Sequence, residues 1–333
     1  MSLSEMMGAG NDTPVPRRRR RRRMLACLPF VVLLVVAAVV VALLLGKGRN
    51  LLPGPVAEGC EVDTPDGIVQ LSLDQMQNAS TIAAVATSRN LPERAVTISL
   101  ATAMQESRLT NLNGGDRDSI GLFQQRPSQG WGTPEQIADP VYATNRFLDK
   151  LVAIPGYAQL PLTEAAQDVQ HSGFPDAYAQ HEADAQTLSG ALTGRVPSAL
   201  NCTVNGVGTS NPAGSGATTL QSELKKDFGR VVSTSAPAAV PSTDAASPSA
   251  APEQRLAVTV HGTAYQSQRA WAVAQWSVAH AKTLHITAVE YAGKIWTSGD
   301  SEKGWVQASS ASPGTSGTSD ASGSSGGLRI TVA

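Results

Sequence analysis

The feature that most constrains the fold of this chain is a run of seven arginines followed directly by a long apolar segment. The arginines are Arg17 to Arg23, and residues 24–45 carry no charge and are mainly Val, Leu and Ala. About 20 apolar residues is the length that an α-helix needs to cross a hydrocarbon core of about 30 Å. Because a helix satisfies its own backbone polar groups in lipid, the sequence predicts a transmembrane helix over 24–45.

The arginine run also predicts the orientation of that helix. Clustered Lys and Arg stay on the cytoplasmic side of a membrane, so residues 1–23 are predicted to form a cytoplasmic tail and the chain after residue 45 to be extracytoplasmic. The predicted location is the cell membrane, with one helix in contact with lipid. Two alternatives compete. An arginine run by itself is also typical of nucleic-acid binding or a nuclear address, and an apolar N-terminal segment is also typical of a cleaved signal peptide.

The charge of the extracytoplasmic part argues against a nucleic-acid partner. The arginine run, Lys47 and Arg49 account for nine of the 26 basic residues, and Glu5 and Asp12 for two of the 27 acidic ones. The chain beyond residue 49 therefore holds 17 basic and 25 acidic residues, a net charge of −8. Because nucleic-acid binding depends on neutralising phosphates with basic side chains, we expect no nucleic-acid partner.

The cysteines agree with an oxidising location. Cys27 lies in the apolar segment, and Cys60 and Cys202 are the only others. Extracytoplasmic compartments permit disulfides, so the sequence predicts a Cys60–Cys202 bond, with two unrelated buried thiols as the alternative. Two cysteines this far apart do not form a metal site, and the sequence predicts neither a metal nor a cofactor.

Composition divides the extracytoplasmic chain into four parts. Residues 46–59 form a short Gly/Pro tether, and residues 60–202 show helical periodicity with little alternation typical of strands. Residues 203–254 are mainly Ser, Thr, Gly, Ala and Pro, which bury too little apolar surface to order the chain. They are predicted to form a disordered linker, apart from a short helix near 220–228. Residues 255–333 combine strand and helix patterns.

Local signals place several elements within these parts. Ser72 with Gln75 resembles a capping box, and Pro92 is suited to the start of a second helix. Further signals are helix starts at Thr133-Pro134 and Asp139-Pro140, strands over 256–260 and 328–332, a helix over 270–284 and a hairpin turn at Ala292-Gly293. The predicted fold class is a mostly α domain plus a small α+β domain, behind one transmembrane helix.

One stretch carries most of the chemical information. Glu106-Ser107 ends an apolar helical pattern, and Gly121-Leu122-Phe123-Gln124 follows after a loop rich in Gly and Asp. A carboxyl group at the end of such a helix is held at the edge of a core, where it can act as the general acid of glycoside cleavage. Aromatic and amide side chains brought back to it by the loop suit a sugar, which has apolar faces and hydroxyl groups.

These residues resemble the lysozyme-like superfamily, and within it the soluble lytic transglycosylase-like domains of actinobacterial cell-wall lytic proteins. The family pattern is a catalytic Glu followed by Ser, then a Gly-Leu-Met-Gln-like segment, in which Phe123 stands here for Met. A later element close to Ala-Tyr-Asn-x-Gly is similar to residues 169–173. Val169 occupies the position of the family's Tyr, and Tyr178 is the candidate replacement. The resemblance covers 60–202.

The resemblance implies a membrane-anchored, extracytoplasmic enzyme that cleaves the glycan strands of peptidoglycan. Glu106 would act first as acid and then as base and leave a 1,6-anhydro product. Its implied substrate-binding residues are Ser107, Phe123, Gln124, Gln170 and Tyr178. Hydrolysis is the rival outcome, with Asp116 or Asp118 activating a water, although an Asp-Arg-Asp sequence is also typical of a solvated turn.

A different class of function is also open. Val169 in place of the family's Tyr favours a catalytically inactive wall-binding or envelope-scaffold protein that keeps the lysozyme-like fold. Residues 255–333 are similar to a small module at the end of some secreted actinobacterial cell-wall proteins. Trp296 and Trp305 could bind the wall or an envelope protein partner there, or fill a small core.

Overall fold

The computed structural model describes residues 57–207, 216–240, 253–262, 265–308 and 327–333. The predicted cytoplasmic tail and the predicted transmembrane helix over 24–45 lie outside these ranges. None of the helices formed by the described residues is both long enough and apolar enough to cross a membrane.

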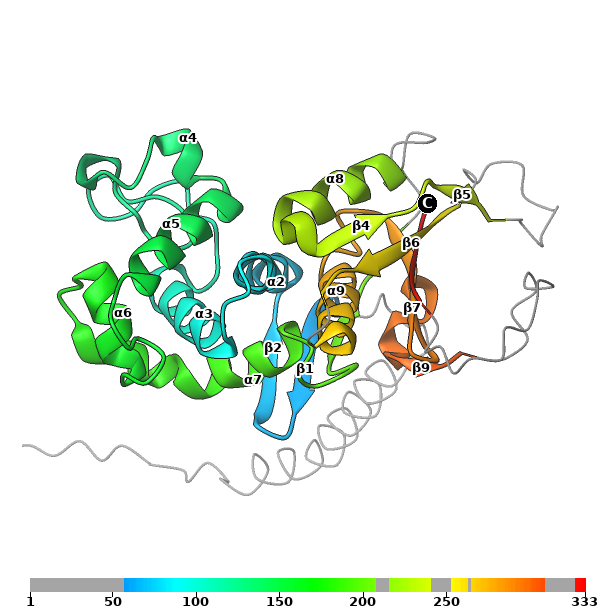
Figure 1. Ribbon diagram of the computed structural model, residues 1–333, viewed down its shortest axis with the longest axis horizontal. Coiled ribbons are helices and arrows are strands. Elements are labelled where there is room, and N and C mark those ends of the chain that lie inside the picture. The colour runs from blue at the N-terminus through cyan, green and yellow to red at the C-terminus, as the bar shows by residue number, and fades with distance from the viewer. Residues whose placement is uncertain (1–56, 208–215, 241–252, 263–264, 309–326) are drawn as a thin grey trace, which may run out of the picture. The chain divides into compact units, whose positions relative to one another are not determined.

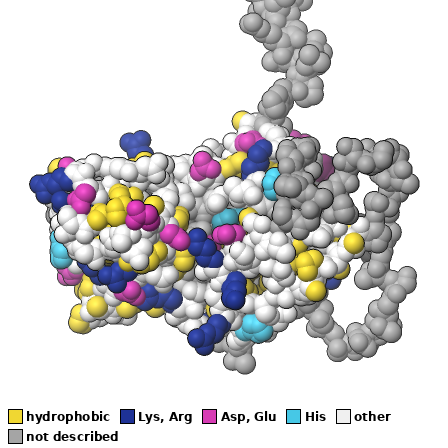
Figure 2. Space-filling view, turned by 90° about the horizontal axis from the view of Figure 1, so that it is seen from above, with side chains coloured by type: hydrophobic (Ala, Val, Ile, Leu, Met, Phe, Trp, Pro, Cys, Tyr) yellow, Lys and Arg dark blue, Asp and Glu magenta, His cyan; other side chains and the backbone are white. Residues whose placement is uncertain are grey.

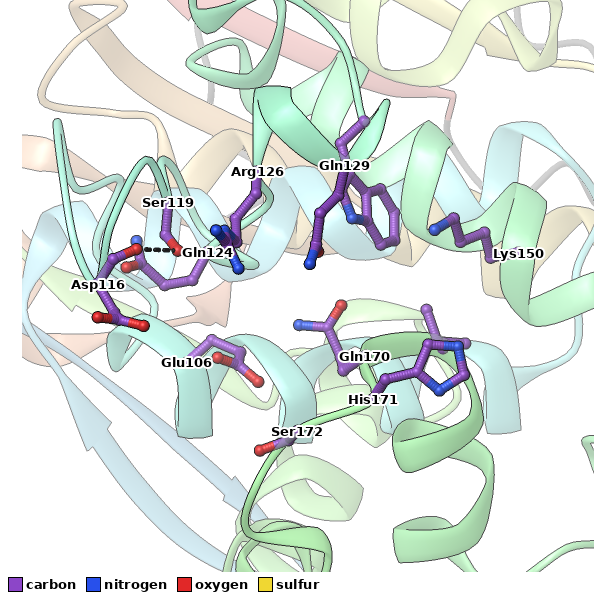
Figure 3. A pocket seen from close by; sticks show the side chains of 12 residues that line it. Glu106, Asp116, Ser119, Gln124, Arg126, Gln129, Lys150, Gln170, His171 and Ser172 are labelled. Atoms are coloured by element: carbon purple, nitrogen blue, oxygen red, sulfur yellow. Dashed lines mark hydrogen bonds between the residues drawn. The ribbon is translucent and has the colours of Figure 1, made fainter.

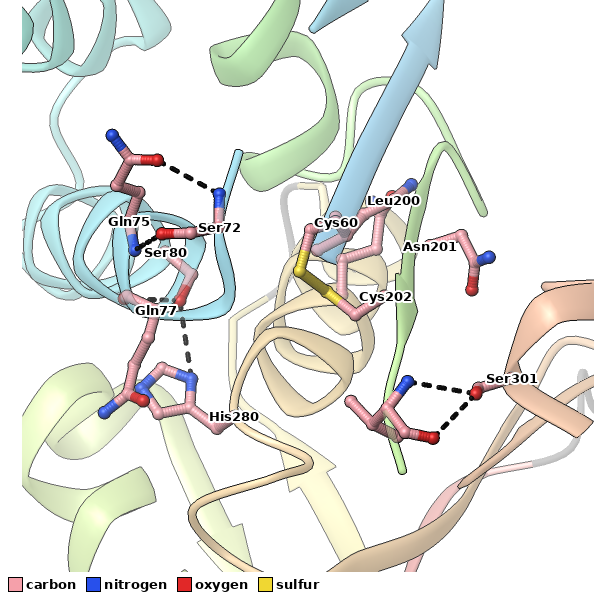
Figure 4. The surroundings of a disulfide bond; sticks show 12 residues. Cys60, Ser72, Gln75, Gln77, Ser80, Leu200, Asn201, Cys202, His280 and Ser301 are labelled. Carbon is pink, nitrogen blue, oxygen red and sulfur yellow. Dashed lines mark hydrogen bonds between the residues drawn. A yellow bond between two sulfur atoms is a disulfide. The ribbon is translucent and has the colours of Figure 1, made fainter. Parts of the chain in front are cut away.

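The first part of the structure begins with a three-stranded antiparallel sheet. Its strands are β1 (Gly59–Thr64), β2 (Gly67–Leu71) and β3 (Leu200–Thr203), in the order β2-β1-β3. Cys60 lies directly opposite Cys202 in the β1–β3 pair, and the two sulfur atoms are bonded (Figure 4). The predicted disulfide is confirmed. Because it joins residues 142 positions apart, loop closure alone stabilises the fold by roughly 4–5 kcal/mol.

Helices follow the sheet, and their starts agree with the predicted signals. The Ser72 hydroxyl accepts from the backbone N–H of Gln75, whose side chain accepts from the Ser72 N–H, which completes the capping box of α2. Pro92, Thr133 and Asp139 precede α3, α4 and α5 as predicted. The helices are α2 (Leu73–Ser88), α3 (Glu93–Ser107), α4 (Pro134–Ile137), α5 (Pro140–Val152), α6 (Leu162–Gln170) and α7 (Glu182–Leu192).

The second part is built on a larger antiparallel sheet with the order β4-β6-β10-β7-β8-β9, in which β5 also pairs with β6. The hairpin turn at Ala292-Gly293 joins β7 to β8 as predicted. The elements of this part are α8 (Gly216–Phe228), β4 (Val232–Thr234), β5 (Ala238–Ala239), β6 (Gln254–Val260), α9 (Gln266–Ala279), β7 (Ile286–Tyr291), β8 (Lys294–Thr297), β9 (Val306–Gln307) and β10 (Leu328–Val332).

The predicted fold class is wrong. A mostly α domain beside a separate small α+β domain was expected, but the described chain contains a seven-stranded sheet as well as the three-stranded one. A single cluster of buried side chains runs through both parts. Helix α2 lies between α3 and the second sheet, with α8 and α9 packed against it (Figure 1). Local periodicity predicted many of these elements, but not that the two parts share one core.

Two contacts show how closely α9 packs on the first part. The buried amide of Gln275 accepts from the backbone N–H groups of Ala199 and Leu200, and it donates to the carbonyl of Ala191. Gly194 has φ +75°, and a Cβ there would lie 1.9 Å from the Gln268 carbonyl oxygen on α9. Only glycine fits such an approach, so this contact depends on a residue without a side chain.

The segment predicted as a linker contains the short helix expected near 220–228, and more of it is ordered than expected. Between 203 and 254, residues 216–240 form α8, a 3₁₀ turn and strands β4 and β5. Leu220, Leu224 and Phe228 recur every four residues and are buried. This apolar stripe on one helix face is sufficient to pack α8 on α2, although the average composition around it is that of a linker.

Trp296 and Trp305, the two candidate binding residues of 255–333, form contacts within the protein. Trp296 is fully buried and donates its indole N–H to the Asn201 side chain, while Trp305 donates to the carbonyl of Leu200. Both therefore pack the second part against β3. On the face drawn in Figure 2, Lys and Arg side chains are interspersed with Asp and Glu side chains.

Candidate functional site

A polar cleft of about 580 Å³ lies among the first group of helices. Its walls come from the end of α3, the loop over 116–126, the residues up to Trp131, the end of α5 and the end of α6. Figure 3 shows Glu106, Gln170 and Ser172 on one wall, with Gln124, Arg126 and Gln129 on the opposite one.

Glu106 reaches this cleft because α3 stops abruptly. Arg108 and Leu109 have φ values of 54° and 59°, a left-handed conformation that ends the helix directly after Glu106-Ser107. The side chains of Gln75 and Asn78 on α2 donate to the carbonyls of these two residues. Because α2 holds the turn in this way, the half-buried Glu106 stays in the last helical turn, with its carboxyl group directed into the cleft (Figure 3).

Tyr178 fixes the Glu106 carboxyl group. It comes from the 3₁₀ helix over Pro175–His181, and its hydroxyl donates to Glu106 Oε1 at 2.8 Å. The Tyr178 side chain is completely buried. Burial first, and the adjacent Glu106 second, raise the pKa of Tyr178 far above its usual value, so it remains a protonated donor. The sequence proposed Tyr178 only as a replacement for the family's Tyr, and the structure puts its hydroxyl on the predicted acid.

Two residues predicted to bind substrate lie behind the cleft wall instead. The buried Ser107 hydroxyl is 2.7 Å from the carbonyl oxygen of Leu122, so it ties the end of α3 to the Gly-Leu-Phe-Gln segment. Phe123 is fully buried and stacks on Phe147 of α5, with 4.6 Å between ring centroids. Both were assigned from the family pattern, and Phe123 also because aromatic faces suit a sugar, but packing with other elements turns them inward.

The Gly-Leu-Phe-Gln segment forms a tight turn. Ile120 and Gln125 exchange backbone hydrogen bonds of 2.9 and 3.0 Å across it. Gly121 has φ +79°, and a Cβ there would lie 2.8 Å from the Ile137 carbonyl oxygen, so a glycine is required. The turn ends at Gln124, whose side chain lines the cleft and donates to the Gly121 carbonyl.

The end of α6 supplies the facing wall. The Gln170 amide donates to the Phe123 carbonyl at 2.9 Å, and its side chain lines the cleft. Val169, the residue in the position of the family's Tyr, is buried and also borders the cleft. The helix ends at His171 in a left-handed conformation, with φ 51°. Gln124 and Gln170 therefore reach the cleft from elements distant in sequence.

The two candidate aspartates have different environments. Asp118 accepts from the Ser128 backbone N–H, from the Arg126 guanidinium and from the Ser128 hydroxyl. The Ser128 backbone bond first, and Arg126 second, hold the pKa of Asp118 well below its usual range, so it is a poor base. Asp116 is exposed and lines the cleft, 3.9 Å from Arg117.

The sequence analysis did not assign several residues that line the cleft, among them Gln129, Trp131 and Lys150. Lys150 lies in the last turn of α5, with its ammonium nitrogen 3.5 Å from the centroid of the Trp131 ring. A lysine in the last turn of an amphipathic helix is an ordinary solvent-facing pattern, so no local signal identifies it. Trp131 was the only residue near it that suggested a binding role.

Within the part of the chain that the structure describes, no group of three or more His, Cys, Asp or Glu side chains is arranged to hold a metal. Comparison of the chain with protein-family models and with curated proteins finds no match. The residues and geometry of the cleft are therefore the basis for the function proposed below.

Proposed function

We propose that this protein cleaves the glycan strands of peptidoglycan as a lytic transglycosylase, with Glu106 as acid and base. The observation that carries the proposal is the Glu106 carboxyl group, held by the Tyr178 hydroxyl at 2.8 Å and directed into a polar cleft. A general acid must be fixed within hydrogen-bonding reach of the leaving oxygen. The resemblance of Glu106-Ser107 and of Gly121 to Gln124 to the transglycosylase pattern supports the choice of substrate.

The proposed reaction has two steps. Glu106 gives its proton to the glycosidic oxygen between N-acetylmuramic acid and N-acetylglucosamine, and the bond from that oxygen to the muramoyl C1 breaks. The acetamido group of the muramoyl ring stabilises the positive C1, which replaces a second enzyme carboxylate. Glu106 then accepts the proton of the C6 hydroxyl as its oxygen bonds to C1 and closes the 1,6-anhydro ring.

The hydrogen bond from Tyr178 distinguishes the two oxygens of the Glu106 carboxyl group. Oε1 receives the Tyr178 hydroxyl, so we assign proton transfer to Oε2. The Gln124 and Gln170 amides, each anchored by a backbone carbonyl, present polar atoms to the hydroxyl and acetamido groups of the sugar. Side chains anchored in this way orient a substrate with little loss of entropy on binding.

Hydrolysis is the second candidate outcome because Asp116 lines the same cleft and is exposed. Asp116 would act as the base for a water that attacks C1, and the product would keep a reducing end. We prefer the transglycosylase outcome because the Glu106 carboxyl group is fixed by a hydrogen bond, whereas among the described residues the Asp116 carboxylate has only a long ion pair with Arg117, at 3.9 Å.

The test uses the full chain, its Glu106→Gln variant and a Glu164→Gln control. Glu164 is an exposed carboxylate on α6 outside the cleft. Each protein is incubated with purified peptidoglycan, and the soluble products are weighed by mass spectrometry. Products one water lighter than hydrolysed muropeptides, lost only with Glu106→Gln, are expected.

Other results would change the conclusion in defined ways. Full-mass reducing products would assign a hydrolase and direct attention to Asp116. Folded protein that binds peptidoglycan but releases nothing would contradict the enzyme and favour the wall-binding alternative. Equal release by Glu106→Gln and by the wild-type protein would show that the chemistry lies elsewhere.

A further inference from the structure

The charged groups of the cleft are separated along its length. Glu106 and Asp116 lie at one end in Figure 3, and Lys150 lies at the other, with the side chains of Gln129 and Gln170 between them. All five residues line the same cleft. Arg126 also lines the cleft, between Gln124 and Gln129 in Figure 3, but its charge is paired with Asp118. Apart from that pair, a ligand that fills the cleft meets carboxylates at one end, amides in the middle and an ammonium group at the other end.

Lys150 differs from the other cations nearby in having no carboxylate partner. Arg126 is paired with Asp118 at 2.9 Å, and Arg146 contacts Asp149 at 3.7 Å. Among the described residues, no ion pair involves Lys150, although Asp149 is its neighbour in the chain. Its ammonium group lies over an aromatic face instead, and a cation–π contact leaves most of the charge unneutralised.

Trp131 holds this ammonium in a fixed place. The ring is almost fully buried, with an exposed fraction of 5%. Its backbone carbonyl accepts from the Tyr142 hydroxyl at 3.2 Å and from the Arg146 guanidinium at 3.4 Å. Because two side chains of α5 hold the Trp131 backbone and the ring itself is buried, the aromatic face under the Lys150 ammonium group is held in place.

The local electrostatics favour an incoming anion. Burial first, and the neighbouring Arg146 second, lower the pKa of Lys150. Both causes disfavour the charged form of the ammonium group, and no ion pair among the described residues offsets them, although the Lys150 residue as a whole is exposed. A bound carboxylate would oppose this shift, because a nearby negative charge favours the ammonium form and raises the pKa of Lys150.

We propose that the Lys150 end of the cleft binds a carboxylate carried by the peptidoglycan strand, an inference that rests on the proposed function. The ligand class is an N-acetylated glycan that bears acidic groups at intervals along its length. Two sources supply such a group in peptidoglycan: the lactyl ether of the muramoyl ring, free where the peptide is missing, and the stem peptide. A neutral chito-oligosaccharide has the same N-acetylated backbone without either one.

The experiment measures dissociation constants at low ionic strength in the Glu106→Gln background, so that no ligand is consumed. The probes are a chito-oligosaccharide, a peptide-free oligomer of alternating N-acetylglucosamine and N-acetylmuramic acid, and the same oligomer with its peptides. Three changes are added separately: Lys150→Met, Lys150→Arg and the control Lys225→Met. Lys225 is an exposed lysine of α8 outside the cleft, so its substitution changes the net charge equally.

The acidic oligomers are expected to bind about tenfold more tightly than the neutral one, the usual contribution of one charge-assisted hydrogen bond. Lys150→Met should abolish that difference and leave chito-oligosaccharide binding unchanged, whereas Lys150→Arg and Lys225→Met should preserve it. A preference limited to the peptide-free oligomer assigns the lactyl carboxylate, and one limited to the peptide-bearing oligomer assigns the stem peptide.

The two proposals fail in different ways. If the wild-type protein releases products but Lys150→Met weakens all three ligands equally or none of them, the carboxylate site is overturned and the enzyme stands. If no oligomer binds and no products are released, both proposals are overturned together.

Discussion

Two carboxylates in this protein have the same kind of partner but very different surroundings. Glu106 accepts from the Tyr178 hydroxyl at 2.8 Å, and Asp227 of α8 accepts from the Trp276 indole N–H at 2.8 Å. Glu106 is half-buried and borders a cleft. Asp227 has an exposed fraction of 3% and a second donor, the Thr81 hydroxyl of α2 at 2.9 Å.

The surroundings of a carboxylate, rather than its hydrogen-bond donor, decide whether it is available for chemistry. An aromatic donor orients both groups, so the donor does not distinguish them. Asp227 is enclosed where α2, α8 and α9 meet, and burial raises its pKa to about 6 against the hydrogen bonds from Trp276 and Thr81. Its ionisation therefore affects stability. Glu106 has an open side, so a ligand in the cleft can contact its carboxyl group.

The largest expected effect separates the two carboxylates by activity. Glu106→Gln should lower the rate of product release from peptidoglycan by about 10²–10⁴-fold, the usual contribution of a general acid. Asp227→Asn should leave that rate within about twofold, because Asp227 is not among the residues that line the cleft. Release rates are measured by chromatography of soluble muropeptides. A similar loss in both variants would remove the functional distinction.

The second prediction concerns the pH dependence of stability. Asp227 has a pKa of about 6 in the fold against 3.8 in the unfolded chain, so the folded state holds its proton more strongly. The contribution of Asp227 to the free energy of unfolding is fully present below about pH 4, and about 3 kcal/mol of it is lost as the pH rises to 6. His280, which stacks on Trp276, has the opposite effect. Burial lowers its pKa to about 4, so stability rises between pH 4 and 6.5.

These two contributions nearly cancel in the wild-type protein. Relative to wild type, Asp227→Asn should become more stable by about 3 kcal/mol as the pH rises from 4 to 6.5, and His280→Gln should become less stable by a similar amount. Denaturant unfolding of the three proteins at half-unit pH steps measures both differences. Parallel curves for all three would mean that neither group is sealed from water.

The third prediction tests the Tyr178 contact. Tyr178→Phe removes only the hydroxyl group, so kcat should fall by about tenfold while KM stays within about twofold, since the bond orients the acid rather than the sugar. Tyr157→Phe is the matched control, because Tyr157 is a partly buried tyrosine outside the cleft. Steady-state kinetics on soluble glycan oligomers separate the two constants. A rise in KM with unchanged kcat would instead make Tyr178 a substrate-binding residue.

The smallest expected effect concerns an exposed aromatic beside the cleft. Phe174 has an exposed fraction of 76% and follows Ser172, which lines the cleft, by two residues. If a sugar stacks on it, Phe174→Ala should weaken glycan binding about fivefold, or about 1 kcal/mol. Tyr265→Ala is the control, since Tyr265 is 74% exposed at the start of α9. Calorimetry that shows equal affinities for all three proteins would exclude the contact.

Sequence-based prediction succeeded where an interaction is short-range or where a residue has few possible partners. The capping box of Ser72 and Gln75 and the cap at Asp139 involve residues within three positions of each other, and they were predicted correctly. The Cys60–Cys202 bond was predicted because few other pairings existed. Ser107 and Phe123 were misplaced because their orientation depends on Leu122 and Phe147, which lie on other elements.

The sequence by itself determined where α2 to α5 begin, which cysteines pair and that Glu106 ends a helix, because short-range hydrogen bonds and a small choice of partners decide these features. The tertiary structure alone decided that Tyr178 reaches Glu106, that Lys150 closes the far end of the cleft, and that α8 and α9 share a core with α2. Each of these depends on which distant segments bury one another, and burial is a property of the packed chain rather than of any local pattern.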